Sequence, residues 1–133
     1  MKLVRIKPAF EDERGQITDI LAHEPIQYVT LITQAKGTTR GNHYHKETIQ
    51  WNYLLNGKVK LLTQLPGAAV ISTVLEVGDL AVTEQEERHA IEALEDSTFL
   101  VLTRGVRGGD DYEKDTYRLA QPLREQGANA QSS

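Results

Sequence analysis

The chain has 133 residues, of which 15 are Lys or Arg, 19 are Asp or Glu, and none is Cys. Because the formal net charge is -4 and the basic residues are interspersed with acidic ones, we expect no nucleic-acid partner. The lack of cysteine excludes disulfides and thiolate chemistry, so any metal site must use nitrogen and oxygen ligands. The first residues contain neither a signal-peptide core nor a long apolar segment, so we expect a cytoplasmic protein with no membrane partner.

Short β-rich runs follow one another along the chain, and no segment shows a helical period. The runs cover residues 2–6, 16–21, 28–33, 49–55, 58–64, 70–77, 79–83, 89–93 and 98–103. Strands of this length, separated by turn signals, are typical of an antiparallel sandwich or barrel, and a jelly-roll barrel is the natural closure. Because a chain of this size buries one core, we predict a single all-β domain.

Turn signals and composition set the predicted boundaries. Asn56-Gly57 predicts a tight hairpin between its flanking strands, since both residues accept positive φ. Pro66-Gly67 and Gly78 mark further turns. Residues 120–133 are rich in Ala, Gln, Gly and Ser, with almost no large apolar side chain. We therefore expect a domain over residues 1–119 and a disordered C-terminal tail over residues 120–133.

A histidine pair carries the most specific motif of the chain. His43 and His45 lie two residues apart, so on a β-strand both imidazoles face the same side. Together with Gly37, Gln50 and Gly57, this pair resembles the first cupin motif at its full spacing.

A second cupin motif follows further along the chain. Gly78 and His89 match its glycine and histidine, whereas Glu84 and Glu86 replace its proline and glycine. The two motifs occur in the expected order, so the chain resembles the RmlC-like cupin superfamily. This resemblance implies a single-domain cupin, an antiparallel jelly-roll β-barrel.

The cupin resemblance also implies a metal site. Its ligands would be three neutral imidazoles and one amide oxygen, from His43, His45, His89 and Gln50. Gln50 stands where the family has glutamate, so the ligand set is neutral and a bound cation would be more electrophilic. We therefore predict a divalent transition metal, with zinc, nickel, iron and manganese all accepting such donors. The alternative is a polar histidine pocket without a metal.

Three further segments sharpen the resemblance. Residues 40–46, the Asp-Glu-Arg-Gly sequence at 12–15 and the closing segment at 110–117 resemble the cupins of polysaccharide biosynthesis. These include the C-terminal cupin domain of capsular polysaccharide reductase-epimerases and the nucleotide-sugar 3,4-ketoisomerases, and the similarity covers roughly residues 10–119. It implies an epimerase or isomerase that acts on a keto-sugar attached to a nucleotide diphosphate. Some of these enzymes carry a metal, whereas the ketoisomerases work without one.

Such a reaction removes a proton next to a carbonyl, holds the enolate and returns the proton elsewhere. In the metal-free version, the resemblance makes His43 or His45 the base. Tyr44 and Tyr53 are candidate proton donors, although tyrosines on strands more often serve in packing. Coordination to a metal would occupy the histidine nitrogens, and the cation would then polarise the carbonyl.

Basic residues near the histidine pair are candidates for binding the substrate's phosphates. Arg40 and Lys46 flank the pair, and the resemblance places Arg14 near a nucleotide diphosphate. The acidic run at 84–87 argues in the opposite direction, because carboxylates at the rim would repel a diphosphate.

Alternation along the strand that follows the histidines predicts an exposed apolar face. If Gln50 points into the barrel, then Trp51, Tyr53 and Leu55 point outward and need cover. The amino-terminal strands or a partner subunit would provide that cover, and we expect a homodimer.

Two functions remain open from the sequence. The first is an isomerase or epimerase with a nucleotide-sugar ligand. The second is a metal cupin that binds a small molecule other than a nucleotide, either as a dioxygenase-like enzyme or as a noncatalytic sensor.

Overall fold

The computed structural model describes residues 1–105 and 114–125, which form twelve β-strands arranged mainly in two antiparallel sheets. The first sheet has the order β1 (Lys2–Arg5), β9 (Asp79–Thr83), β6 (Ile49–Asn56), β11 (Ser97–Arg104) and β4 (Tyr28–Gln34). The second has the order β12 (Tyr117–Arg118), β5 (Thr39–Tyr44), β10 (Arg88–Ala93), β7 (Val59–Gln64) and β8 (Ile71–Leu75). No helix in this part of the chain is long and apolar enough to cross a membrane.

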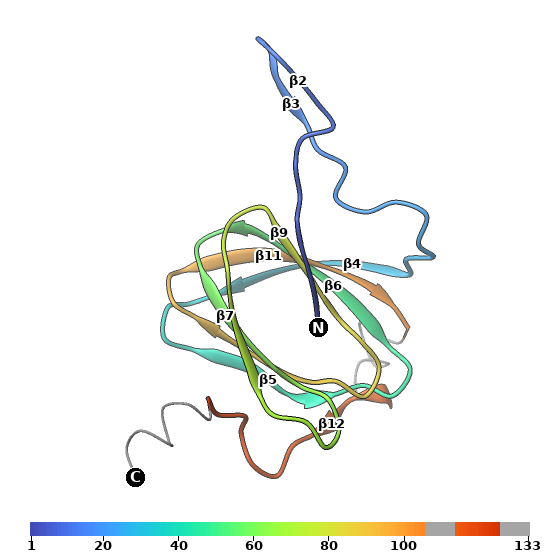
Figure 1. Ribbon diagram of the computed structural model, residues 1–133, viewed down its shortest axis with the longest axis vertical. Helices are drawn as coiled ribbons and strands as arrows, with labels where there is room; N and C mark the ends of the chain where they lie inside the picture. The colour runs from blue at the N-terminus through green and yellow to red at the C-terminus, as the bar shows by residue number, and fades with distance from the viewer. Residues whose placement is uncertain (106–113, 126–133) are drawn as a thin grey trace.

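The two sheets pack face to face and bury the main core between them (Figure 1). Strand β11 illustrates why, since Phe99 and Val101 are buried while Leu100 and Leu102 on its other face are partly exposed. The buried core cluster comprises Leu54, Val59, Leu61, Leu75, Ala81, Phe99 and Val101. The predicted all-β, antiparallel cupin fold is confirmed, although the described strands of the two sheets do not pair into a closed barrel.

The outer face of the first sheet is covered around Trp51, whereas Leu55 stays 40% exposed. Trp51 is only 6% exposed and packs with Leu80 and Val82. The residues that close over this cluster come from the amino-terminal part of the chain, chiefly Ile6, Ile20, Leu21 and Ile26. Nearer the edge of the same face, Val29 and Leu31 on β4 stay 66% and 62% exposed.

The hairpin predicted at Asn56-Gly57 was wrong. Strands β6 and β7 lie in different sheets, so this connection crosses from one layer to the other. Gly57 has φ 90°, and a Cβ there would lie 2.8 Å from Ser97 Cα. Glycine therefore allows the chain to pass close to Ser97 where it crosses from one sheet to the other. The Pro66-Gly67 turn does join a paired hairpin, between β7 and β8.

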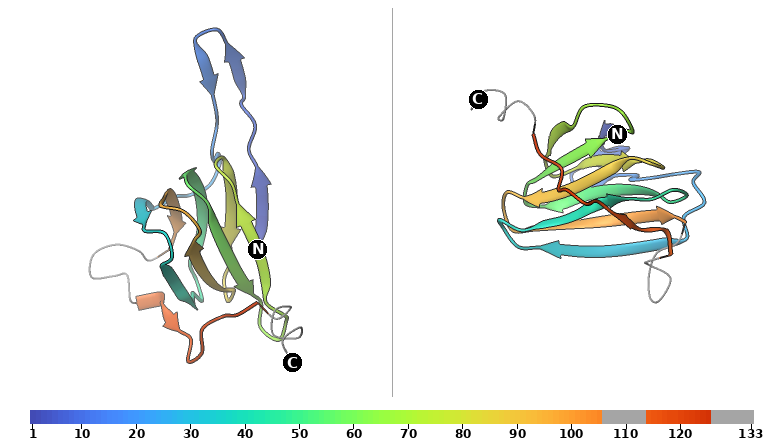
Figure 2. Two further views of the ribbon diagram at one scale, coloured as in Figure 1. Left: turned by 90° about the vertical axis from the view of Figure 1, so that its left-hand side faces the viewer. Right: turned by 90° about the horizontal axis from the view of Figure 1, so that it is seen from below.

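A separate hairpin, β2 (Phe10–Asp12) and β3 (Gly15–Ile17), projects away from the two sheets (Figures 1 and 2). Its apolar side chains have no cover, with Phe10 51% and Ile17 60% exposed. The run predicted as a strand over 16–21 therefore contributes only its first residues to a strand.

The chain after β12 crosses the second sheet, as the right-hand view of Figure 2 shows. The Leu119 amide donates to the Asn42 carbonyl, the Leu123 amide to Asn42 Oδ1, and Lys60 Nζ lies 3.0 Å from Glu125 Oε2. These contacts involve residues 119–125, and residues 126–133 lie outside the described part of the chain. The domain boundary at residue 119 stays a prediction.

The layer crossing at Gly57 makes a specific prediction. Gly57→Ala should cost about 1–3 kcal/mol more of the free energy of unfolding than Gly67→Ala, measured by urea denaturation. Both glycines have positive φ, but a Cβ at Gly67 meets open space. The backbone strain is therefore common to both variants, and equal losses of stability would contradict the close-crossing role.

Candidate functional site

A β-bulge in β5 orients His43, the first histidine of the site. In the ladder between β5 and β10, His43 pairs with His89 and Gly41 pairs with Ala90, so Asn42 is the extra residue. Gly41 and Asn42 both have positive φ, at 93° and 58°. A Cβ at Gly41 would lie 2.8 Å from the His89 carbonyl oxygen, so the two strands approach this closely only because residue 41 is glycine.

The bulge brings the three predicted histidines together. His43, His45 and His89 are all buried, and one nitrogen from each lies within 4.8 Å of the others. The His43 ring centroid is 4.9 Å from that of His45 and 4.6 Å from that of His89. His45 itself follows the last residue of β5, so the geometry of a regular strand accounts for only part of the convergence.

Backbone carbonyls orient two of the three rings. His45 Nδ1 lies 2.7 Å from the Asp115 carbonyl oxygen, and His89 Nδ1 lies 3.2 Å from the Glu87 carbonyl oxygen. A carbonyl only accepts hydrogen bonds, so each Nδ1 is the donor. In the neutral rings, Nε2 then carries the lone pair that accepts a proton or binds a cation.

Asp115 also fixes the loop that follows His45. Its buried carboxylate accepts the backbone amides of Lys46, Glu47 and Thr48 at 2.9 Å, and the Thr48 hydroxyl at 2.8 Å. Burial raises the pKa of the Asp115 carboxyl, but these hydrogen bonds outweigh burial and hold the pKa below its usual value. The group is therefore a carboxylate at neutral pH.

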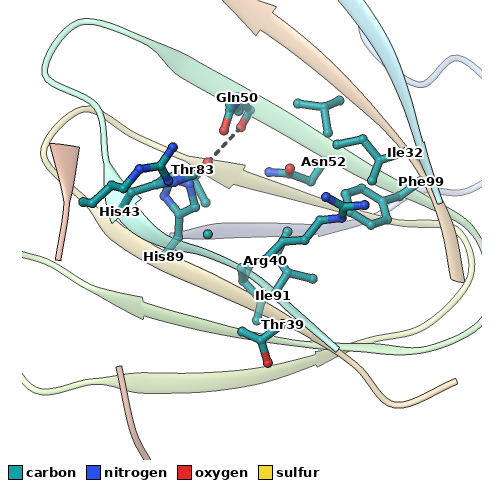
Figure 3. A pocket seen from close by; sticks show the side chains of 14 residues that line it. Ile32, Thr39, Arg40, His43, Gln50, Asn52, Thr83, His89, Ile91 and Phe99 are labelled. Carbon is teal, nitrogen blue, oxygen red and sulfur yellow. Dashed lines mark hydrogen bonds between the residues drawn. The ribbon is translucent and has the colours of Figure 1, made fainter. Parts of the chain in front are cut away.

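A pocket of about 300 Å³ opens beside the histidines, between the two sheets (Figure 3). Figure 3 shows His43 and His89 at one end and Ile32 and Phe99 at the other. The lining residues fall into three groups. They are the polar His43, His89, Gln50, Asn52, Thr39 and Thr83; the basic Arg40 and Arg118; and Gly41 with the apolar Ile32, Leu61, Ile91, Phe99 and Val101.

The charge of this lining is one-sided. Two guanidinium groups line the pocket, and none of its lining residues in the described chain is acidic. In the acidic run, Glu84 and Glu86 are exposed and do not line the pocket, and the buried Glu87 carboxylate accepts the Glu84 amide. The expected repulsion of a diphosphate by this run therefore does not arise from the pocket wall.

Gln50, His43, His89 and Arg40 are predicted site residues that do line the pocket. Gln50 is buried and comes from β6 in the opposite sheet. His45 lies directly beside these residues in the histidine cluster, without lining the pocket itself.

Three other predicted site residues lie away from the pocket. Tyr53 packs with the Trp51 cluster on the outer face of the first sheet and does not line the pocket, and its role as a proton donor stays a prediction. Lys46 Nζ sits 4.5 Å from the centroid of the Tyr117 ring. Arg14 pairs with Asp12 in the projecting hairpin and is 80% exposed.

The pocket and the adjoining histidine cluster also involve residues that sequence reasoning did not assign to the site. Asn52 and Thr83 lie on β6 and β9, which both fall within predicted strand runs. Because side chains alternate between the two faces of a strand, the sequence already indicated that both point inward. Arg118 and Asp115 had a weaker signal, because only the pairing of β12 with β5 brings their segment to the histidines. Residues 110–113 of the closing motif lie outside the described residues.

Comparison with solved structures identifies proteins of the same fold. The chain is 24% identical to QdtA, a sugar 3,4-ketoisomerase from Thermoanaerobacterium thermosaccharolyticum, over 90% of this chain and 88% of that one, with a TM-score of 0.73. A 3,4-ketoisomerase from Helicobacter canadensis is 19% identical, with coverages of 89% and 90% and a TM-score of 0.75. The rmlC epimerase of Mycobacterium tuberculosis is 16% identical, with coverages of 95% and 80% and a TM-score of 0.73.

These neighbours are RmlC-like cupins, as the two histidine motifs predicted. No curated protein sequence matches the chain significantly. The family model described as the polysaccharide biosynthesis C-terminal domain matches residues 10–117, which span both motifs and every residue lining the pocket except Arg118. The chain therefore belongs to the polysaccharide biosynthesis C-terminal domain family.

Proposed function

We propose that the protein is an isomerase or epimerase of nucleotide-linked keto-sugars. The observation that carries this proposal is the composition of the pocket, which combines two imidazoles, two buried amides and two guanidinium groups, with no acidic side chain among the described residues that line it. QdtA binds TDP, and a variant of it with asparagine in place of a histidine binds TDP-4-keto-6-deoxyglucose. These ligands have the chemistry that such a pocket suits, namely a diphosphate and a ketone.

The proton transfer is assigned to His43. It lines the pocket, and imidazole is the side chain that most often serves as a general base near neutral pH. His89 lies across the strand pair with its ring centroid 4.6 Å from that of His43, within reach of the same substrate carbons. The Gln50 amide faces the pocket from the opposite sheet and serves as a hydrogen-bond donor to the enolate oxygen.

The diphosphate is assigned to Arg40 and Arg118. Arg40 lies on β5, three residues before His43. Arg118 pairs with His43 in the ladder between β12 and β5. Guanidinium groups bind phosphate oxygens through charge-assisted hydrogen bonds, and their strength depends on salt. The same two charges disfavour the alternative of a small-molecule cupin without a nucleotide.

We propose further that the histidine cluster binds a divalent transition metal when one is supplied. The donor set fits, since His45 and His89 each anchor Nδ1 on a backbone carbonyl, as metal-binding histidines commonly do. The ligands would be His43, His45 and His89, with Gln50 as an oxygen donor. A bound cation would supply Lewis-acid polarisation of a carbonyl, and His43 would then no longer accept a proton.

We also propose a homodimer. The exposed Val29 and Leu31 on β4 and the uncovered Phe10 and Ile17 of the projecting hairpin are apolar surface that a second copy would bury. The cytoplasmic location and the lack of nucleic-acid and membrane partners stay predictions from the sequence.

The role of His43 is tested by His43→Asn. This variant keeps a polar side chain of similar reach but removes the base, so turnover of TDP-4-keto-6-deoxyglucose should fall by about 100-fold or more. The affinity for TDP, measured by isothermal titration calorimetry, should change little because His43 is not assigned to the phosphates. An active His43→Asn enzyme would contradict the assignment.

The role of Arg118 is tested with a matched control from the same segment. Arg118→Ala should weaken TDP binding by about ten-fold or more, because a hydrogen bond to a charged group contributes about 1.5–3 kcal/mol. Arg124→Ala removes the same charge at an exposed position outside the pocket and should leave the affinity unchanged. Equal affinities for both variants would remove Arg118 from the phosphate site.

The metal proposal is tested by adding zinc to chelator-treated protein. About one equivalent per chain should be retained after dialysis and lost in His89→Ala, as measured by elemental analysis. Isomerase activity of the wild type should fall on zinc binding, because coordination occupies His43. If the wild type retains no metal, the coordination model fails while the proton-transfer assignment is unaffected.

A further inference from the structure

Asp115 is an unusual residue in this fold because its side chain and its backbone make different contacts with the same loop. The side chain is buried and uses both carboxylate oxygens on the loop directly after His45. The backbone carbonyl of the same residue reaches His45 Nδ1 at 2.7 Å. Fixing the side chain on the loop therefore also fixes the distance between the carbonyl and the imidazole.

The carboxylate leaves this loop little freedom. It accepts three consecutive backbone amides, from Lys46 to Thr48, and a hydroxyl from Thr48. Such charge-assisted hydrogen bonds are stronger than neutral ones, particularly where water is excluded. The loop is also tied to its other neighbour, since the His45 carbonyl accepts the Glu86 amide at 2.7 Å and Gln85 Nε2 donates to the Glu47 carbonyl.

The carbonyl contact determines which nitrogen of His45 carries the proton. Since a carbonyl has no hydrogen to donate, Nδ1 must be protonated, and Nε2 of the neutral ring carries the lone pair. The His45 ring lies 4.9 Å from His43 and 5.2 Å from His89 between centroids, so the tautomer decides whether Nε2 of a ring adjacent to His43, the proposed base, is a donor or an acceptor.

We propose that Asp115 is a positioning residue for the reaction: its carboxylate holds the loop at 46–48 so that its own carbonyl keeps His45 in the tautomer with the proton on Nδ1. The proposal rests on the proposed function for its catalytic consequence. The effect of Asp115 on the His45 tautomer is independent of the proposed function, because the tautomer can be observed without substrate.

The test compares Asp115→Asn with the wild type by ¹⁵N NMR of labelled histidines and by steady-state kinetics. An amide at this position turns one acceptor into a donor that faces backbone N–H groups, so the loop should loosen. His45 should change from one tautomer to a mixture of both. The kcat for TDP-4-keto-6-deoxyglucose should fall by about 10- to 100-fold with KM nearly unchanged. Losses of this size are typical when the group that hydrogen-bonds the other ring nitrogen of a functional histidine is removed.

Asp79→Asn is the matched control. Asp79 is also a buried aspartate, and its carboxylate also accepts a backbone amide, that of Glu76, but it does not line the pocket. This variant should lose stability while His45 keeps one tautomer and kcat stays at the wild-type value. A mixed tautomer in Asp79→Asn would show that general loosening, rather than Asp115, sets the ring.

Thr48→Val provides the second variant if Asp115→Asn does not fold. It removes one hydroxyl donor to Asp115 Oδ2 at almost constant volume, and it should shift the His45 tautomer in the same direction with a smaller loss of kcat. A single wild-type tautomer in every folded variant would overturn the proposal. If the wild type is inactive on the keto-sugar but the tautomer shifts as described, the substrate assignment fails and the positioning role stands.

Discussion

The pairing of β5 with β10 determines the geometry of the histidine site. This pairing places His43 opposite His89, and the bulge at Asn42 turns the strand so that both rings meet inside the sandwich. The close approach requires a glycine at position 41, because any larger residue would contact the His89 carbonyl. A buried imidazole cluster is costly unless its polar atoms are satisfied, and the carbonyls of Asp115 and Glu87 meet part of that cost.

The interior of the sandwich is divided between stability and function. Toward one end, Leu54, Leu61 and Phe99 form a fully apolar core that holds the sheets together. Toward the other, strand positions that would normally contribute apolar side chains carry Gln50 and Asn52 instead. The polar end stabilises the fold less, but it gives the pocket hydrogen-bonding groups that are fixed by two sheets before any ligand arrives.

Much of this arrangement was predictable from the sequence. The period of two along residues 49–55 predicted both the inward Gln50 and the outward Trp51, because strand geometry alone dictates which side chains share a face. The histidine triad was predictable from motif spacing. The hairpin at Asn56-Gly57 was not predicted correctly, since turn chemistry reports a reversal or crossing but not which sheet the next strand joins. Arg118 and Asp115 depended on a two-residue strand, β12, whose partner is set by tertiary packing more than 70 residues away in sequence.

We propose that this pocket moves a proton at a carbon next to a ketone of a nucleotide-linked sugar. The most direct test is to incubate the wild type with TDP-4-keto-6-deoxyglucose in D₂O and follow the sugar protons by NMR. Proton transfer in the pocket should cause enzyme-dependent loss of the proton signal at a carbon adjacent to the ketone, whether or not a rearranged product accumulates, because solvent exchange requires only removal and return of the proton. Binding of the nucleotide sugar without any exchange above the uncatalysed rate would rule out proton transfer and leave the pocket as a binding site alone.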